Sequence, residues 1–136
     1  MKTFVRVLSL CLVAVLLCTA FVACGVSSNP DKAVDALKEA KYEVDKESDA
    51  DDLKFYEEMY EISGLVAMVS ALKVADGKSD SITLYYFEKT ADAKAALEKM
   101  EKAREDIPAE YKEGITLDRS GKVIYSGTAA AIEVIK

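Results

Sequence analysis

A run of acidic residues between positions 45 and 52 is the first place where residue types and spacing suggest metal chemistry. In a helix–loop–helix calcium loop, carboxylates recur at alternate positions and a further carboxylate closes the loop at position twelve. Glu47, Asp49, Asp51 and Glu58 match that spacing. Such a loop normally begins with Asp and needs Gly at position six, where this chain has Asp52. The run therefore favours a solvated acidic loop with a helix cap, and we expect no metal site and no cofactor.

Residues that commonly carry hydrolytic chemistry are missing or form no distinct set. The chain has no His, which removes the commonest general base, most zinc sites and the Ser-His-Asp triad. It contains neither a glycine-rich phosphate loop nor a Gly-x-Ser-x-Gly elbow. Among its 24 acidic residues, no pair stands out from an ordinary solvated surface. We therefore expect no catalytic residues and no enzymatic activity, with a small hydrolase that uses carboxylates or Tyr as the alternative.

Aromatic residues give a clearer indication of binding. Tyr85, Tyr86 and Phe87 are consecutive in a β-forming segment, so Tyr86 points to one face of a strand while Tyr85 and Phe87 point to the other. The segment is more apolar on the side of Tyr86, which predicts that Tyr86 belongs to the core. Tyr is favoured at binding surfaces because it combines a large area with a polar tip. The candidate binding face is Tyr85, Phe87 and Tyr125, and ordinary core and boundary packing is the alternative.

All three cysteines lie within the first 24 residues, in a segment whose layout indicates secretion. Lys2 and Arg6 form a basic start, and an uncharged apolar run follows over residues 7–23. This order of regions, closed by a small residue, is typical of a signal peptide. Cys24 follows a small residue, Ala23, whereas the other two cysteines follow Leu. Cys24 is therefore the cysteine that fits a cleavage point.

The segment Phe21-Val22-Ala23-Cys24-Gly25 resembles the lipobox of bacterial membrane lipoproteins. Phe21 departs from the usual pattern, in which Leu stands three positions before the cysteine. The resemblance implies diacylglycerol on the Cys24 sulfur, cleavage of the chain before Cys24, and a lipid anchor in the cell membrane with the domain on its extracytoplasmic face. Each buried methylene contributes about 0.8 kcal/mol to such anchoring, so two or more acyl chains hold a protein stably.

The domain boundaries follow from this resemblance and from composition. We expect a signal peptide over residues 1–23, a lipidated tether of mostly small residues over 24–29, and a single domain over 30–136. Two alternatives stay open. One is an uncleaved membrane anchor, because the apolar run is close to the roughly 17 residues that can span a bilayer. The other is an ordinary signal peptide cut near Ala20 or Ala23.

The charge balance limits the partners. Loss of Lys2 and Arg6 from the 18 basic residues, against 24 acidic ones, changes the net charge from −6 to −8. A negative surface disfavours nucleic acid and electrostatic binding to anionic headgroups, because both need positive charge. The expected partners are therefore the lipid bilayer, through acylated Cys24, and an envelope protein or a small ligand.

Local signals place two helices and a strand at the start of the domain. Asn29, Pro30 and Asp31 combine a cap, a proline in the first turn and an acid at the positive end of the helix dipole. Ser48, with Asp51 three positions later, is typical of a capping box. The expected elements are helices over 30–41 and 50–60 and a strand over 42–45.

Two hairpins and two helices are expected in the remainder. Gly77 and Gly121 lie in turn signals between apolar, β-forming runs. Thr90 is expected to cap the clearest helix, and Pro108 to end it. The predicted inner face of that helix contains Ala93, Ala96, Leu97, Met100, Ala103 and Ile107. The expected elements are strands over 65–74, 81–87, 115–117 and 123–125 and helices over 90–107 and 129–135.

This order of elements predicts an α+β fold, an antiparallel sheet of four to five strands with helices packed on one face. An antiparallel sheet of this kind can leave its second face partly open to solvent. The open face is therefore where we expect a binding surface.

The C-terminal half carries a second, weaker resemblance. A Tyr85-Tyr86-Phe87-Glu88 strand leads into an Ala-rich charged helix, and Gly121-Lys122-Val123-Ile124-Tyr125-Ser126-Gly127-Thr128 leads into a closing helix. This arrangement is similar to small uncharacterised lipoproteins of Gram-positive, clostridial-type bacteria, which supply no activity to carry over. The sequence therefore predicts a membrane-anchored extracytoplasmic lipoprotein that acts as a binding or interaction module, with a small envelope hydrolase as the alternative.

Overall fold

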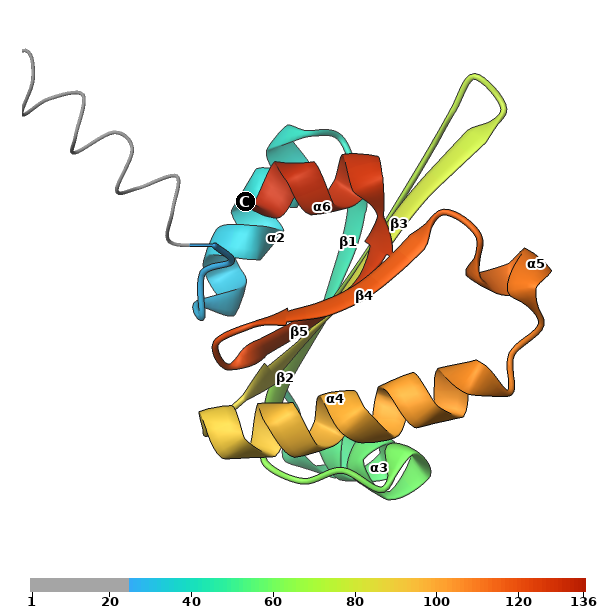
Figure 1. The fold of residues 1–136 in the computed structure, drawn as a ribbon. Helices are drawn as coiled ribbons and strands as arrows, with labels where there is room; N and C mark the ends of the chain where they lie inside the picture. Colours follow the sequence, from blue (N-terminus) through green and yellow to red (C-terminus); the bar gives the residue numbers. More distant parts are fainter. Residues whose placement is uncertain (1–24) are drawn as a thin grey trace, which may run out of the picture.

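The computed structural model describes residues 25–136, which form a five-stranded antiparallel sheet flanked by helices (Figure 1). The predicted α+β class and antiparallel sheet are confirmed, and the strand order is β1-β2-β3-β5-β4. The strands are β1 Glu43–Glu47, β2 Leu65–Ala75, β3 Lys78–Phe87, β4 Ile115–Ser120 and β5 Val123–Thr128. The helices are α2 Pro30–Glu39, α3 Ala50–Tyr60, α4 Thr90–Glu105, α5 Ala109–Lys112 and α6 Ala129–Ile135.

The N-terminal caps of α2 and α3 can be compared with the caps that the sequence predicted. The Asn29 side chain accepts a hydrogen bond from the Asp31 backbone N–H at 3.0 Å, which confirms the predicted cap of α2. The predicted capping box at Ser48 is wrong, because the cap of α3 is Asp49, one residue later. Its carboxylate accepts from the backbone N–H groups of Asp51 and Asp52. A charged cap has the further benefit of the helix dipole, which a serine lacks.

The connection after α4 also differs from the prediction. Thr90 is the first residue of α4 rather than its cap, and Lys89, at the cap position, makes no side-chain capping bond. The helix ends at Glu105, shortly before Pro108, and a short helix that the sequence did not predict, α5, follows. This turn of helix lies at the far end of α4, beside the start of β4 (Figure 1).

Helices lie on both faces of the sheet, so the prediction that they pack on one face is wrong. Helices α2 and α6 cover one side and helices α3 and α4 the other (Figure 1). The reason lies in β2, whose side chains are apolar in both directions. Ala67, Val69 and Ala71 join the cluster beneath α2 and α6, while Leu65 and Met68 join the cluster beneath α3 and α4. The two sides are called the α2/α6 face and the α3/α4 face below.

The α2/α6 face is closely packed. Leu37, Leu84 and Ala131, from a helix, the central strand and the last helix, are each fully buried. Gly127 of β5 leaves no space for a side chain, because a Cβ there would lie 2.5 Å from the carbonyl oxygen of Ser81. Tyr86 is 1% exposed, which confirms its predicted place in the core. Its hydroxyl is buried without a hydrogen-bond partner, and burial raises the pKa of Tyr86 to about 12.

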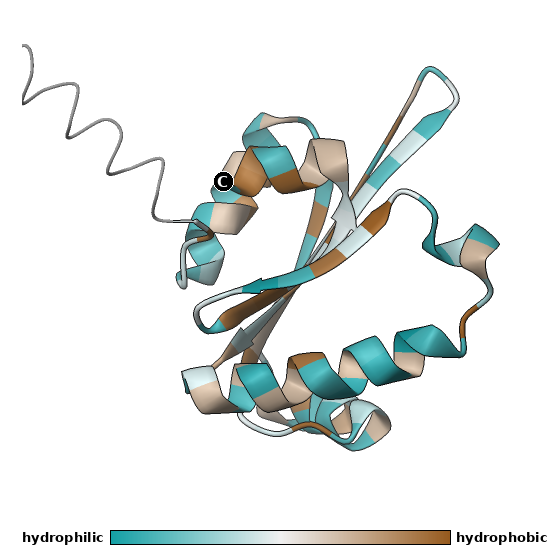
Figure 2. Ribbon diagram, viewed as in Figure 1, coloured by the Kyte–Doolittle hydropathy of each residue, from teal (hydrophilic) through white to brown (hydrophobic). Residues whose placement is uncertain are grey.

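The α3/α4 face is packed at one end only. Near the start of α4, the side chains of Phe87, Ala93 and Ile124 are buried together. Further along α4 the burial ends. Ala103, predicted on the inner face of this helix, is exposed, and so is Ile107, which lies beyond the end of the helix rather than on that face. Figure 2 shows α4 as mostly hydrophilic, with apolar residues interspersed along its length. The far half of this helix therefore projects apolar side chains that no other element covers fully.

The segment before α2 is packed against the domain. Val26 is 7% exposed and belongs to the α2/α6 cluster, and its backbone N–H donates to Ser120 Oγ at 3.2 Å. Within the predicted tether, Val26 is therefore packed against the domain, while Ser28 and Asn29 are exposed. The predicted signal peptide, residues 1–23, and Cys24 lie outside the described residues. Among residues 25–136, no helix has the length and hydrophobicity needed to cross a membrane.

Candidate ligand-binding groove

The predicted binding face of Tyr85, Phe87 and Tyr125 is not formed. Tyr125 pairs with Leu84 across the β3–β5 ladder, and directly paired residues share a face, so Tyr125 lies on the α2/α6 face. Tyr85 pairs with Ile124 and lies on the opposite, α3/α4 face with Phe87. Phe87 and Tyr125 are 3% and 5% exposed, so both are core residues. Tyr85 alone of the three is half-buried.

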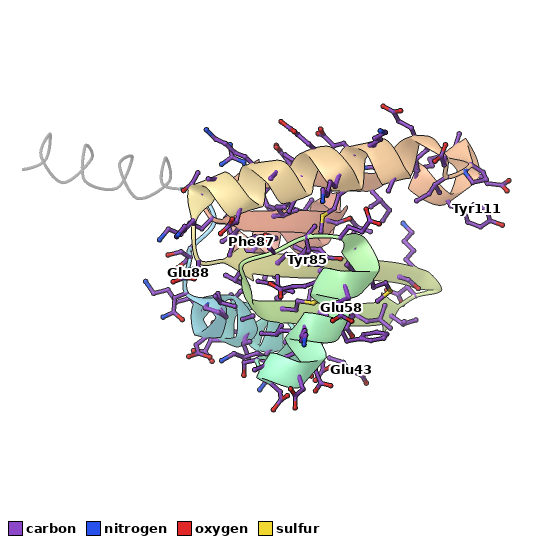
Figure 3. The ribbon with its side chains drawn as sticks, turned by 90° about the horizontal axis from the view of Figure 1, so that it is seen from below. Glu43, Glu58, Tyr85, Phe87, Glu88 and Tyr111 are labelled. Carbon is purple, nitrogen blue, oxygen red and sulfur yellow. The ribbon has the colours of Figure 1, made fainter. Side chains whose placement is uncertain are left out.

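Tyr85 forms part of a groove between the far half of α4 and the sheet. Figure 3 shows α3 crossing the sheet, α4 running alongside it, Tyr85 between the two helices and Tyr111 beyond the end of α4. The groove has a volume of about 250 Å³. Its lining comes from α3, α4, α5 and three strands, and we name it the aromatic groove. The lining residues are Tyr60, Tyr85, Met100, Ala103, Arg104, Ile107, Tyr111, Lys112, Ile115, Leu117 and Ser126.

Three large apolar or aromatic side chains of the groove lining are exposed. Tyr60 is 40% exposed, Ile107 44% and Tyr111 71%. These three side chains come from α3, the connection between α4 and α5, and α5, so they surround the opening from different sides. Adjacent exposed apolar residues on a soluble domain commonly mark a binding surface. The groove is the place on the α3/α4 face where such residues converge.

Ring packing fixes the positions of the tyrosines on the α3 side. The Tyr60 and Tyr85 rings are perpendicular, with centroids 6.2 Å apart, and the Tyr56 and Tyr60 rings are stacked at 6.5 Å. Phe55 adds an edge-on contact with Tyr56 at 5.7 Å. Aromatic pairs in these geometries contribute about 0.5–1.5 kcal/mol beyond area burial. The chain of rings therefore holds Tyr60 against Tyr85 before any ligand arrives.

Two cationic side chains hold the other side of the groove together. Arg104 donates to the carbonyl oxygens of Ile115 and Lys112, the latter at 3.4 Å. Lys112 in turn donates from Nζ to the carbonyl oxygen of Arg104 at 3.1 Å. These bonds join the end of α4, α5 and the start of β4. Tyr111, carried on α5, is thereby placed at the rim of the groove.

The phenol of Tyr85 stays protonated in this setting. Burial is the largest cause that raises the pKa of Tyr85, and the neighbouring Tyr60 and Tyr56 phenols raise it further. A protonated phenol is a hydrogen-bond donor and a poor nucleophile. No Asp or Glu is among the residues that line the groove. The site therefore presents hydroxyl donors, two cations and apolar surface.

A second hollow continues the groove across α3. It shares Tyr60, Met100 and Ala103 with the aromatic groove and extends to Met59, which is 51% exposed. Its charged residues balance, since Glu61 and Asp106 face Lys99 and Lys102. The Lys99 Nζ donates to the carbonyl oxygen of Glu61, which links α4 to the end of α3. An elongated ligand could therefore lie across both hollows.

A third hollow, on the same face beyond α3, has a mixed lining that includes Leu72. It is lined by short hydroxyl side chains, among them Ser70 and Thr83, and by the carboxylates of Glu43 and Asp45. The acidic run that suggested calcium lies nearby as the start of α3, where Asp49 acts as a helix cap. Within residues 25–136, no group of three or more His, Cys, Asp or Glu side chains is placed to hold a metal ion.

The sequence missed most of the groove residues. Tyr60 had been placed on a helix, and Ile107 on an inner helix face, without any reason to bring the two together. Arg104, Tyr111 and Lys112 had no distinguishing pattern. One signal was present: the predicted helix over 50–60 has large apolar residues on two faces, more than a single core contact requires.

Comparison of the chain with models of protein families, with curated proteins and with solved structures gives no match. The geometry of the groove therefore carries the functional inference, together with the lipobox-like sequence around Cys24.

Proposed function

We propose that the protein is a membrane-anchored, extracytoplasmic lipoprotein that acts as a binding module, with the aromatic groove as its ligand site. One observation carries the binding proposal: apolar and aromatic side chains from three helices stay exposed around a groove, although the other end of the same face is sealed. The anchoring proposal is supported by the lipobox-like segment that ends at Cys24.

The composition of the groove supports a small ligand rather than a broad protein interface. Small-molecule sites are concave, mostly apolar and equipped with a few polar groups that orient the ligand. The aromatic groove has an apolar lining of Met100, Ile107 and Leu117, with Tyr hydroxyls and Ser126 as polar groups. Its volume of about 250 Å³, extended by the neighbouring hollow, is close to the range of roughly 300–1,000 Å³ typical of such sites.

The alternative of a Tyr- or carboxylate-dependent envelope hydrolase receives less support. A Tyr nucleophile needs a lowered pKa, whereas burial raises the pKa of Tyr85 and of Tyr86. The aromatic groove is lined by no carboxylate that would serve as a general base. The third hollow does contain Glu43 and Asp45, but neither a His nor an aromatic side chain is among its described lining residues.

The binding proposal is tested by filling the groove. Ala103 is exposed and lines both connected hollows, so Ala103→Trp should occupy the groove without disturbing the buried clusters. We expect this variant to lose most of the binding of an apolar fluorescent dye that the wild-type protein binds. Ala95→Trp, on an exposed part of the same helix that lines neither hollow, is the matched control and should bind as wild type. Equal dye binding by both variants contradicts the groove as the site.

The anchoring proposal is tested at Cys24. Replacement by Ala removes the sulfur that the proposed lipid is attached to, so Cys24→Ala should give an unprocessed precursor that takes up no labelled fatty acid. Cys11→Ala and Cys18→Ala should be labelled and processed as wild type. Labelling of the Cys24→Ala protein would show that the lipid, if any, is attached elsewhere.

A further inference from the structure

The charges around the aromatic groove are of one sign, unlike those of the protein as a whole. The chain has a net charge of −6, with 24 acidic residues, yet the groove is lined by Arg104 and Lys112 and by no carboxylate. The adjoining hollow, by contrast, is lined by two acidic and two basic residues. A local excess of positive charge in an acidic protein is a feature that an anionic ligand would complement.

Both cations are held in place without a counter-ion. Within the described part of the chain, one ion pair is found, between Lys46 and Asp31 at 2.8 Å, and it is remote from the groove. The Arg104 and Lys112 hydrogen bonds go to backbone carbonyl oxygens, which orient the two side chains but leave their charges uncompensated. A fixed, uncompensated charge beside an apolar wall favours a ligand group of opposite sign.

We infer that the aromatic groove binds a small amphipathic carboxylate, with its acidic group near Arg104 and Lys112 and its apolar body along Met100, Ile107 and Leu117. This inference rests on the proposed function and specifies the ligand of the same site. The ring of Tyr111 covers the ligand from the rim, and the hydroxyls of Tyr85 and Ser126 are available as further donors. The second hollow receives the end of a longer apolar chain.

A carboxylate fits these donors better than a doubly charged group does. Arg104 and Lys112 already use part of their hydrogen-bonding capacity on the carbonyl oxygens of one another and of Ile115. The donors that remain are few, and two of the nearby groups are neutral hydroxyls. A phosphate monoester would bring more charge and more acceptors than this set can satisfy.

The test compares ligands that share one alkyl chain and differ in the head group. The full chain is titrated in a mild detergent, and the heat of transferring each compound into the detergent alone is subtracted. Calorimetric titration with decanoate, decanol and decylammonium should show decanoate binding about tenfold more tightly than decanol, as expected for a hydrogen bond to a charged group. Decylammonium should bind most weakly.

Charge reversal at the groove locates the head group. Lys112→Glu should abolish the preference for decanoate over decanol, because it places a negative charge where the carboxylate lies. Lys94→Glu makes the same charge change on an exposed part of α4 outside the groove and should leave the preference intact. Unfolding curves of both variants serve as the folding control. Each variant should unfold cooperatively, as wild type does, so that a lost preference reports on the groove and not on unfolding.

The possible results distinguish failure of the carboxylate inference from failure of the proposed binding function. If decanol binds as tightly as decanoate, or if Lys112→Glu keeps the preference, the inference is overturned while the groove stands as an apolar site. If none of the three compounds binds, both the inference and the proposed function fail.

Discussion

The two faces of one sheet are put to different use in this protein. Among the described residues, the α2/α6 face holds fifteen buried side chains in a single cluster, and a Cβ at Gly127 would meet the backbone of β3. The α3/α4 face holds eight, all toward one end, and opens into a groove at the other. The same strands therefore supply stability on one side and a site on the other. A surface can be left incompletely packed when the opposite side supplies enough of the folding free energy.

The largest expected effect is a difference in stability when the same Leu→Ala substitution is made on each of the two faces. Leu37 in α2 is fully buried, so Leu37→Ala should lower the free energy of unfolding by about 2–5 kcal/mol. Leu97 in α4 is only partly buried, and Leu97→Ala should cost roughly half as much. Both changes lie in helices, so helix propensity cancels. Urea unfolding measures the difference, and equal losses would mean that the two faces contribute alike.

A second contrast uses two consecutive residues of β5. Gly127→Ala adds a methyl group toward β3 that meets backbone atoms of Ser81 and Ile82, so it should destabilise by about 1–3 kcal/mol. Ser126 points to the opposite face and lines the groove, where Ser126→Val has space and should change stability by less than about 0.5 kcal/mol. Thermal unfolding of the two variants checks this. A large loss from Ser126→Val would show that the groove is as closely packed as the core.

A third prediction concerns the buried hydroxyl of Tyr86. Because this group has no hydrogen-bond partner, Tyr86→Phe should raise the free energy of unfolding by about 1 kcal/mol at neutral pH. The folded pKa, about 12, is higher than the ordinary value of 10.0, so the unfolded chain loses its proton first as pH rises. Stability should therefore be unaffected by this group below pH about 10 and fall between about 10 and 12.

The Tyr86→Phe variant should lack the decrease in the free energy of unfolding that ionisation of Tyr86 causes between pH about 10 and 12. Parallel urea titrations of wild type and variant from neutral to alkaline pH measure it. A destabilised variant would indicate that the hydroxyl has a partner, such as a buried water molecule, that supports the fold.

The smallest effect on stability is expected at the rim of the groove. Tyr111 is 71% exposed, so Tyr111→Ala should change the free energy of unfolding by less than about 0.5 kcal/mol. The same variant should bind an apolar dye or decanoate several-fold more weakly, because exposed aromatic residues often dominate binding. Stability and binding are thus expected to separate at this residue. Loss of both together would place Tyr111 in the core, and loss of neither would remove it from the site.

Local sequence signals predicted the elements but not their arrangement in layers. The cap at Asn29, the turns at Gly77 and Gly121 and the stop at Pro108 depend on neighbours along the chain. The elements around them were predicted, although β4 and β5 are each twice as long as expected. The distribution of helices over two faces depends on which strand each helix meets, which no local pattern encodes. The apolar residues of β2 point in both directions, but the sequence of this strand does not specify which helix covers which face.

The site was harder to predict for the same reason. Tyr85 was identified because three consecutive aromatic residues are visible in the sequence. Its partners in the groove, Tyr60 and Tyr111, lie 25 residues before it and 26 after it, and the cross-strand register that sends Tyr125 to the other face is set by pairing. Alternation along one strand shows which of its residues lie on the same face. It does not show which residues of a neighbouring strand lie on that face, because this depends on the pairing register.

The packed position of Val26 has a consequence for how the domain would move on a membrane. If Cys24 carries the lipid, a single residue, Gly25, separates it from a side chain that is fixed in the core and from the Ser120 hydrogen bond. Rotation of the domain about its attachment point would then be restricted to a narrow range of angles. The β4–β5 turn at Ser120 and Gly121 would stay near the lipid headgroups, and the tip of the β2–β3 hairpin, at the opposite end of the molecule, would point away from them (Figure 1).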